Sequence, residues 1–514
     1  MPVTLPSPSI RHFANAADYV RNVIRQDQID RYLPGGRHFI DDALIRATLR
    51  KAADAPDPND PARVREILAK SLAIQTLDPD EVATLIHVTD PALLAEMRET
   101  ALKVKQFVYD NRIVVFAPLY ISNYCVNRCA YCGFRDDNCH EKRRRLSMDE
   151  IKEEVDVLAG KIGHKRLIAV YGEHPLTSTD YYAETIQTIY DHVVKAPSGA
   201  PVGIRRVNVN AAPLPIEDLK VLHEVGIGTF QVFQETYHRP TYEKLHPADT
   251  VKGNYDWRTT CFHRCQEAGV DDVGLGVLYG LYDWKYELMA ILLHSRDLEK
   301  WFNIGPHTIS FPRLQPASGT DVPTTSPYLV SDDDFLKIVT ITRLAVPYTG
   351  LIVTARERQE IRELCYDCGM TQMDCSSNIA IKGYSDFANV ADQEIDRQQF
   401  LLGDPRSLDD VVRATAARGS LVSFCTAGYR CGRTGGCIMD ALKTGREGKF
   451  CKINAVLTMQ EWLDDFASPE TKAMVAPIIR RELDEAKAML KPSFFEVVMD
   501  HYRRICAGER DLFF

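Results

Sequence analysis

Short apolar runs alternate with longer amphipathic stretches through the middle of the chain. Each run has the length and residue types of a buried strand, and all but the last precede a stretch with helical spacing. This alternation predicts parallel strands joined by crossover helices. Eight such units over about 270 residues predict an α/β fold, a (β/α)8 TIM-type barrel. The expected strands are Val114–Ile121, Leu167–Tyr171, Ile204–Asn210, Thr229–Gln234, Val273–Leu278, His307–Phe311, Leu351–Thr354 and Gln372–Cys375.

Helical patterns dominate both ends of the chain. Before the barrel we expect helices at Ala14–Gln26, Phe39–Ala52 and Val64–Ile74, and another that opens at Asp78. After it we expect helices at Arg406–Arg418, Met459–Ala467 and Pro469–Lys491, with Ser468 as a cap and a kink or split at Pro477. We therefore predict a helical N-terminal extension (1–110), a barrel (111–394) and a helical C-terminal domain (395–514).

Composition narrows the classes of function. The chain has 514 residues, a net charge of -9 and 14 cysteines. It has no general basic surface, so nucleic acid is not an expected partner, and the run Lys142–Arg145 is interpreted as a solvated face. No apolar run reaches the length of a membrane span, and the first residues lack a secretory pattern. A reducing cytoplasm is therefore predicted, with cysteines that bind metal rather than form disulfides.

Three cysteines follow the first predicted strand in the pattern C-x3-C-x2-C: Cys125, Cys129 and Cys132. One loop can direct all three thiolates at a cubane iron–sulfur cluster. Such clusters usually have four cysteine ligands, so one iron would stay open for a small molecule. The pattern resembles the motif of radical S-adenosylmethionine (SAM) enzymes. A zinc site is the alternative, but it usually has a second pair of ligands nearby.

Other residues with binding chemistry lie at later strand ends. Gly172 and Glu173 follow the second strand, where a carboxylate could bind an ammonium group. Glu235 and Tyr237 follow the fourth and could bind a ribose, and Gly276 in the fifth could lie against an adenine. These five residues are the predicted SAM contacts.

Three further residues are weaker candidates for binding a metal or the substrate. His307 could ligate a metal, although a lone histidine is more often structural. Arg313 or Arg356 could clamp a substrate carboxylate, and either could equally form an ion pair. The pairs Cys261/Cys265 and Cys365/Cys368 are interpreted as packing residues.

The segments Phe116–Cys129, Gly172–Pro175, Phe230–His238, Gly276–Asp283 and Gly305–Ser310 together resemble the HydG/ThiH family. The resemblance extends from about Phe39 to about Ser468, and the long C-terminal region favours the HydG branch. HydG proteins are radical SAM tyrosine lyases that help build the H-cluster of FeFe-hydrogenase. ThiH proteins are 2-iminoacetate synthases.

The resemblance implies a reaction. Cys125, Cys129 and Cys132 would hold a 4Fe-4S cluster that binds SAM, with an external flavodoxin- or ferredoxin-type electron donor. L-tyrosine would be cleaved between Cα and Cβ to p-cresol and dehydroglycine (2-iminoacetate). In HydG proper a second cluster then yields carbon monoxide and cyanide, with other hydrogenase maturases as partners. By resemblance, His307 matches the histidine that ligates an extra iron there.

The second cluster is where this chain departs from the family pattern C-x2-C-x22-C. Cys425 and Cys451 match its ends, but Gly428 occupies the middle position. Cys431 and Cys437 are extra thiols in the same loop. Three interpretations stay open: the cluster is rebuilt with Cys431 or Cys437, it is absent, or the loop holds another metal. We favour the rebuilt site.

We therefore expect a radical SAM tyrosine lyase of the HydG type, with carbon monoxide and cyanide as further products. The alternatives are an enzyme that stops at 2-iminoacetate, a radical SAM lyase for another amino acid, and an iron–sulfur scaffold or carrier.

Overall fold

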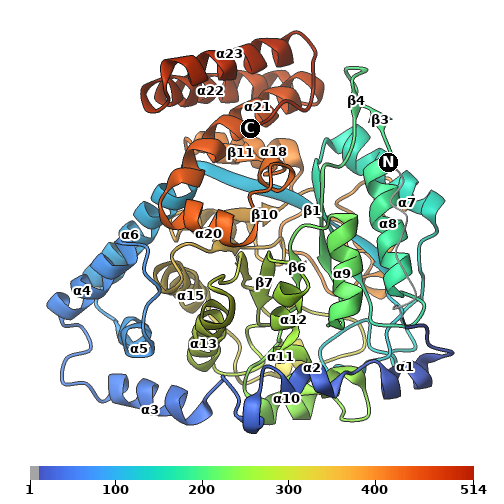
Figure 1. The fold of residues 1–514 in the computed structure, drawn as a ribbon, viewed down its shortest axis with the longest axis vertical. Helices are drawn as coiled ribbons and strands as arrows, with labels where there is room; N and C mark the ends of the chain where they lie inside the picture. The colour runs from blue at the N-terminus through green and yellow to red at the C-terminus, as the bar shows by residue number, and fades with distance from the viewer. Residues whose placement is uncertain (1–10) are drawn as a thin grey trace.

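The computed structural model describes residues 11–514; the first ten residues, on which the expected lack of a secretory pattern rests, lie outside the described residues. Eight parallel strands form a closed barrel, because the last strand pairs with the first. All eight predicted strands are present, which confirms the predicted fold (Figure 1). They are β1 (Arg112–Ser122), β2 (Arg166–Tyr171), β5 (Arg206–Asn210), β6 (Phe230–Gln231), β7 (Val273–Gly276), β8 (Thr308–Ser310), β9 (Gly350–Ile352) and β10 (Gln372–Asp374).

Strand β1 shows how alternation builds the barrel. All eleven of its residues are buried. Ile113, Val115 and Ala117 join the large core that packs against the helices. Phe116 points the other way and forms a small separate cluster with Ile168 and Ile352 of two other strands. Since successive side chains of a strand face opposite sides, this cluster crosses the barrel interior.

Crossover helices surround the barrel. Most of them present an apolar face to the main core and a polar face to solvent, and three short ones contribute to smaller buried clusters instead. Their bounds are α7 (Met148–Val155), α8 (Thr179–Asp191), α9 (Ile216–Val225), α10 (Arg239–Leu245), α11 (Tyr255–Thr259), α12 (Cys261–Glu267), α13 (Trp284–Phe302), α14 (Val322–Thr325), α15 (Asp332–Ala345), α16 (Gln359–Leu364) and α17 (Gly383–Asp386). A small hairpin, β3 (Val194–Lys195) with β4 (Pro201–Val202), lies between α8 and β5.

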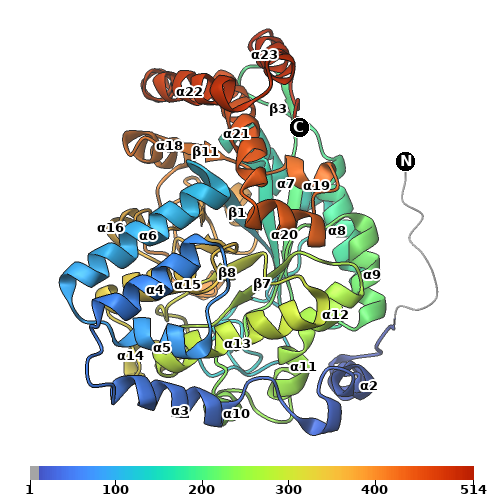
Figure 2. The ribbon, with the colours of Figure 1, turned by 60° about the vertical axis from the view of Figure 1, so that its left-hand side comes forward.

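The earliest N-terminal helices and the latest C-terminal helices lie at opposite ends of the barrel, whereas the last helix of the N-terminal extension packs against α21. In Figure 1, helices α1 to α3 lie along the lower side and α21 to α23 at the top, and Figure 2 shows the same separation. The N-terminal helices are α1 (Ala16–Asn22), α2 (Gln26–Asp30), α3 (Asp42–Ala53), α4 (Pro61–Leu72), α5 (Pro79–His87) and α6 (Pro91–Tyr109). The C-terminal ones are α18 (Leu408–Ala417), α19 (Ala427–Arg430), α20 (Gly435–Lys443), α21 (Arg446–Asp465), α22 (Pro469–Met489) and α23 (Pro492–Cys506).

Two details of the C-terminal region differ from expectation. Ser468 caps α22 as predicted, because its side chain accepts a hydrogen bond from the backbone of Thr471. The expected split at Pro477 is absent: α22 continues through the proline, and Val475, Ile478 and Ile479 around it are buried. Burial of this face stabilises the helix across the missing hydrogen bond. A short ninth strand, β11 (Leu421–Ser423), was not predicted; it pairs with the start of β1.

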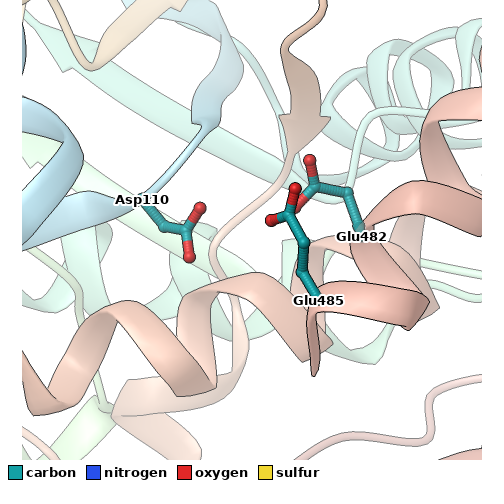
Figure 3. A group of neighbouring side chains, drawn as sticks. All are labelled: Asp110, Glu482 and Glu485. Atoms are coloured by element: carbon teal, nitrogen blue, oxygen red, sulfur yellow. The ribbon is translucent and has the colours of Figure 1, made fainter. Parts of the chain in front are cut away.

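An ion cluster around the buried Lys452 joins the barrel to the C-terminal helices. Asp110, Glu482 and Glu485 bring their carboxylates together (Figure 3). The ammonium of Lys452 lies among them, 3.1 Å from Asp110 Oδ1 and 2.6 Å from Glu485 Oε2. The lysine therefore supplies the cation, and we assign this cluster to structure. Within residues 11–514, no helix is both long and apolar enough to cross a membrane.

Candidate active site

A large cavity opens at the carboxyl-terminal ends of the barrel strands. Its volume is about 1490 Å³ including the space at its mouth, and the small cluster of Phe116, Ile168 and Ile352 lies at its floor. Cys125, Cys129 and Cys132 all contribute to its wall. Barrel enzymes place their active sites at this end. The structure thus brings the three predicted cluster ligands into one cavity.

The three thiols influence one another. Burial raises the pKa of Cys129 to about 12, an effect that the nearby Lys252 ammonium opposes and the other two cysteines reinforce. Burial also raises the pKa of Cys125. The side-chain amide of Gln399 donates to Cys132 Sγ at 3.4 Å. Protonated thiols of this kind lose their protons when they bind iron, so the loop fits a cluster with three cysteine ligands.

Glu173 lies beside the first cysteine. The residue is 5% exposed, and its carboxylate accepts hydrogen bonds from Asn127 Nδ2 at 2.6 Å and from the Tyr19 hydroxyl at 3.4 Å. Burial raises its pKa. Gly172 is required by close packing, because a Cβ there would lie 2.2 Å from the carbonyl oxygen of Tyr124. A buried carboxylate held at the cavity wall fits the ammonium group of SAM.

The other three predicted SAM contacts lie in different environments. Glu235 lines the cavity and pairs with Lys252 Nζ at 2.6 Å. Tyr237 lies behind the wall, where its hydroxyl contacts His294 Nδ1 at 2.7 Å. A Cβ at Gly276 would lie 2.4 Å from the ring of Phe233, and that ring lines the cavity instead. Of these three residues, only Glu235 faces the cavity directly.

The two candidate arginines also differ. The guanidinium of Arg313 already pairs with two carboxylates. Its Nε lies 3.0 Å from both carboxylate oxygens of Glu357, and its Nη2 lies 2.9 Å from Asp332. Arg356 lines the cavity and stacks over the ring of Phe400, 3.2 Å from its centroid. Among residues 11–514 the Arg356 guanidinium has no carboxylate within 4.0 Å. The geometry therefore favours Arg356 as the carboxylate clamp.

The predicted ligands of a second cluster lie at the other end of the barrel. Cys425 and Cys451 are neighbours, and Arg112 acts on the Cys451 thiol through charge and a hydrogen bond. His307 stands just before β8, where its Nε2 lies 3.2 Å from the Tyr429 hydroxyl.

The extra thiols, Cys431 and Cys437, are exposed. As arranged, the pair Cys425 and Cys451 is one ligand short of the three-cysteine pattern seen at the other end of the barrel. These residues do not fit a second cubane without a rearrangement of the loop.

Several residues of the cavity were not predicted. Asn127 lies inside the cysteine motif and joins Cys125, Glu173 and the backbone of Lys252. Lys252 and Arg258 neutralise the buried carboxylate of Glu235. Asn127 could have been noticed from its place between two cysteines. Lys252, Arg258 and Gln399 come from distant segments, and no local pattern marks them.

The barrel and its three-cysteine cavity define the class of protein. Residues 119–293 match the family described as the Radical SAM superfamily, and residues 310–420 match the Biotin and Thiamin Synthesis associated domain. Membership of this class implies a 4Fe-4S cluster and SAM.

Similarity to solved structures and to curated relatives narrows this class to one family. The chain is 44% identical to HydG, a maturase of the [FeFe]-hydrogenase, over 93% of this chain and 100% of that one, with a TM-score of 0.85. It is 32% identical to the maturase HydG from Carboxydothermus hydrogenoformans, over 91% and 98%, with a TM-score of 0.72. It is 27% identical to 2-iminoacetate synthase from Salmonella typhimurium, over 74% of this chain and 92% of the relative. The chain belongs to the HydG/ThiH family.

Proposed function

We propose that this protein is a radical SAM lyase that cleaves the Cα–Cβ bond of L-tyrosine to p-cresol and 2-iminoacetate. The observation that carries the proposal is the unpaired guanidinium of Arg356 in the same cavity as Cys125, Cys129 and Cys132. A planar guanidinium binds a carboxylate through two parallel hydrogen bonds. Similarity to HydG and to 2-iminoacetate synthase supports the reaction.

Each cavity residue has a role in this proposal. When bound and reduced by an external flavodoxin- or ferredoxin-type donor, the cluster and SAM supply a 5'-deoxyadenosyl radical. Glu173 binds the ammonium group of SAM, with Asn127 and Tyr19 holding its carboxylate in place. Arg356 binds the carboxylate of tyrosine. The chain's contribution to rate is to hold the two molecules in reacting geometry and to keep water out.

Product analysis tests the proposal. Reduced, iron-reconstituted protein with SAM and tyrosine should form 5'-deoxyadenosine and p-cresol in equal amounts. Formation of 5'-deoxyadenosine without p-cresol would redirect the assignment to another amino acid, and parallel reactions with tryptophan and other amino acids would identify it. Absence of both products, with cluster transfer to an apo-protein intact, would support a scaffold or carrier instead.

We propose a second function, release of carbon monoxide and cyanide for hydrogenase maturation with other maturases as partners. It is favoured by the neighbouring Cys425 and Cys451, by the contact of His307 with Tyr429, four residues after Cys425, and by the similarity to HydG over nearly the whole chain. It requires Cys431 or Cys437 to complete a second cluster. Haemoglobin trapping of carbon monoxide tests it, together with iron analysis, for which about four irons per chain would argue against it.

A further inference from the structure

A short segment that follows the last barrel strand, residues 398–402, forms part of the wall of the active-site cavity, and we call it the strap. The residue directly after it, Gly403, donates its backbone N–H to the carbonyl oxygen of Ala355 at 2.7 Å. Ala355 directly precedes Arg356, so the strap is tied to the loop that carries the proposed substrate clamp. Three strap residues line the cavity: Gln399, Phe400 and Leu402.

One strap residue contacts a predicted cluster ligand. Gln399 Nε2 donates to Cys132 Sγ at 3.4 Å, and Gln399 Oε1 accepts a hydrogen bond from the Tyr120 hydroxyl at 3.1 Å. A cysteine that binds iron is a thiolate and can only accept, so the amide must present its N–H to the sulfur. The Tyr120 hydroxyl then donates to the carbonyl end of the amide and holds it in this orientation.

The backbone of the strap packs closely against the cysteine loop. A Cβ at Gly133, the residue directly after Cys132, would lie 3.0 Å from the carbonyl oxygen of Gln399 and 3.3 Å from that of Gln398. Gln398 is 1% exposed, and its Nε2 donates to the carbonyl oxygen of Phe400 at 2.9 Å. The side chain of Gln399 therefore reaches Cys132 from a backbone that is held in place on both sides.

The next strap residue contacts the proposed substrate clamp. Phe400 is buried, and the guanidinium of Arg356 lies 3.2 Å from the centroid of its ring. A guanidinium that stacks on an aromatic face keeps its N–H edge free for the two parallel hydrogen bonds of a carboxylate. Phe400 thus fixes the plane of Arg356 without occupying the edge that would bind a ligand.

We propose that the strap positions both partners of the reaction, with Gln399 acting on the cluster site through Cys132 and Phe400 acting on the substrate through Arg356. Hydrogen bonds to the sulfurs of an iron–sulfur cluster set its reduction potential. An N–H donor favours the more negative, reduced state, so Gln399 makes a cluster held at Cys132 easier to reduce. The role of Phe400 rests on the proposed function, whereas that of Gln399 rests only on membership of the radical SAM class.

A redox titration followed by EPR tests the role of Gln399, in iron-reconstituted protein without SAM or tyrosine. Cys425→Ala serves as the background, so that the signal comes from one cluster. Gln399→Leu should lower the midpoint potential, so that the ratio of reduced to oxidised cluster at a fixed potential falls about three- to tenfold, where tenfold corresponds to 59 mV. Gln399→Glu exchanges the donor for a negative charge and should lower the potential further.

Gln359→Leu is the matched control for these variants, because Gln359 is exposed on α16 and lies outside the cavity lining. It should leave the potential unchanged. An unchanged potential in both Gln399 variants, or a loss of bound iron in both, would overturn the role of Gln399 in setting the potential.

Steady-state kinetics test the role of Phe400. Phe400→Leu should raise the KM for tyrosine about three- to tenfold, the loss expected for one cation–π contact, with kcat changed less than twofold and the potential unchanged. Phe400→Tyr keeps the aromatic face and should restore the KM. Equal KM values in the Leu variant and the parent would overturn this role. Absence of p-cresol in the parent, with the potential shift of Gln399→Leu present, would count against the lyase assignment alone.

Discussion

Buried charged side chains are paired differently at the two ends of the barrel. At the carboxyl end, Glu235 pairs with Lys252, while within residues 11–514 the Arg356 guanidinium has no carboxylate within 4.0 Å. At the amino end, Arg166 and Asp272 are both buried and make no hydrogen bond within residues 11–514, although His307 Nδ1 lies 3.5 Å from Asp272 Oδ1. Stabilising pairs are retained where the scaffold must stay fixed, and at the carboxyl end the guanidinium of Arg356 remains unpaired where the substrate is expected to bring the counter-charge. In this scheme the charge-paired Glu235 and Arg313 are positioning residues, whereas Arg356, and Glu173 with its neutral hydrogen-bond donors, are left to bind charged groups of a ligand.

The largest expected difference between the two ends comes from removing one cysteine from each. Cys129→Ala takes one of the three ligands of the C-x3-C-x2-C motif, and Cys139, the other thiol of this loop, lies outside that spacing, so cluster binding and the formation of 5'-deoxyadenosine should be abolished. Cys425→Ala changes the opposite end and should leave p-cresol formation within about twofold. Iron analysis and product chromatography measure both variants. A loss of p-cresol in Cys425→Ala would show that the two ends are not independent.

The next contrast is between the paired and the unpaired arginine. Arg356→Gln should raise the KM for tyrosine by about 10- to 100-fold, since a charge-assisted contact of about 1.5–3 kcal/mol is lost. Arg313→Gln leaves Glu357 buried without its partner, so it should lower the free energy of unfolding by about 3 kcal/mol.

Steady-state kinetics and denaturant unfolding measure the two effects for both variants. The opposite result, a stability loss in Arg356→Gln and a KM effect in Arg313→Gln, would reverse the assignment.

A restored cysteine sharpens the comparison at the amino end. A Cβ at Gly428 has no neighbour closer than 3.8 Å, and the position has no positive φ, so Gly428→Cys fits without strain. With Cys425 and Cys451 it would complete three thiols, and the iron content should rise by about four per chain. Gly436→Cys, an open position at the start of α20, is the matched control and should add none. Equal iron in wild type and Gly428→Cys would mean that the native loop already binds a second cluster or that neither loop does; the absolute count distinguishes these outcomes.

Local patterns predicted the barrel and the cysteine loop. The pairing of charged side chains could not be predicted from them. The strands appear in the sequence because each is a continuous apolar run, and Cys125, Cys129 and Cys132 are close along the chain. β11 is as short as β8, β9 and β10, but it lies outside the strand–helix alternation that predicted the barrel. Glu357 follows Arg356 directly, yet it pairs with Arg313, which is 44 residues away.

The same limit applies at the amino end. Arg166 and Arg206 stand forty residues apart, and their shared face follows only from the strand register. A residue that is identified by its lack of a charged partner can therefore be recognised only from the tertiary structure.

The smallest expected effect concerns the N-terminal helix that reaches the SAM site. Tyr19 of α1 is buried against Val126 of the cysteine loop and donates to Glu173 at 3.4 Å. Tyr19→Phe keeps the packing and removes this long hydrogen bond, worth about 1 kcal/mol, so the Kd for SAM should rise by about three- to tenfold. Tyr32→Phe is the matched control, because its hydroxyl contacts Glu267 on the outside of the barrel. The EPR spectrum of the reduced cluster, titrated with SAM, measures both variants. An equal change in both would mean that the N-terminal helices act through general stability, and a change in Tyr19→Phe alone would show that the extension positions Glu173.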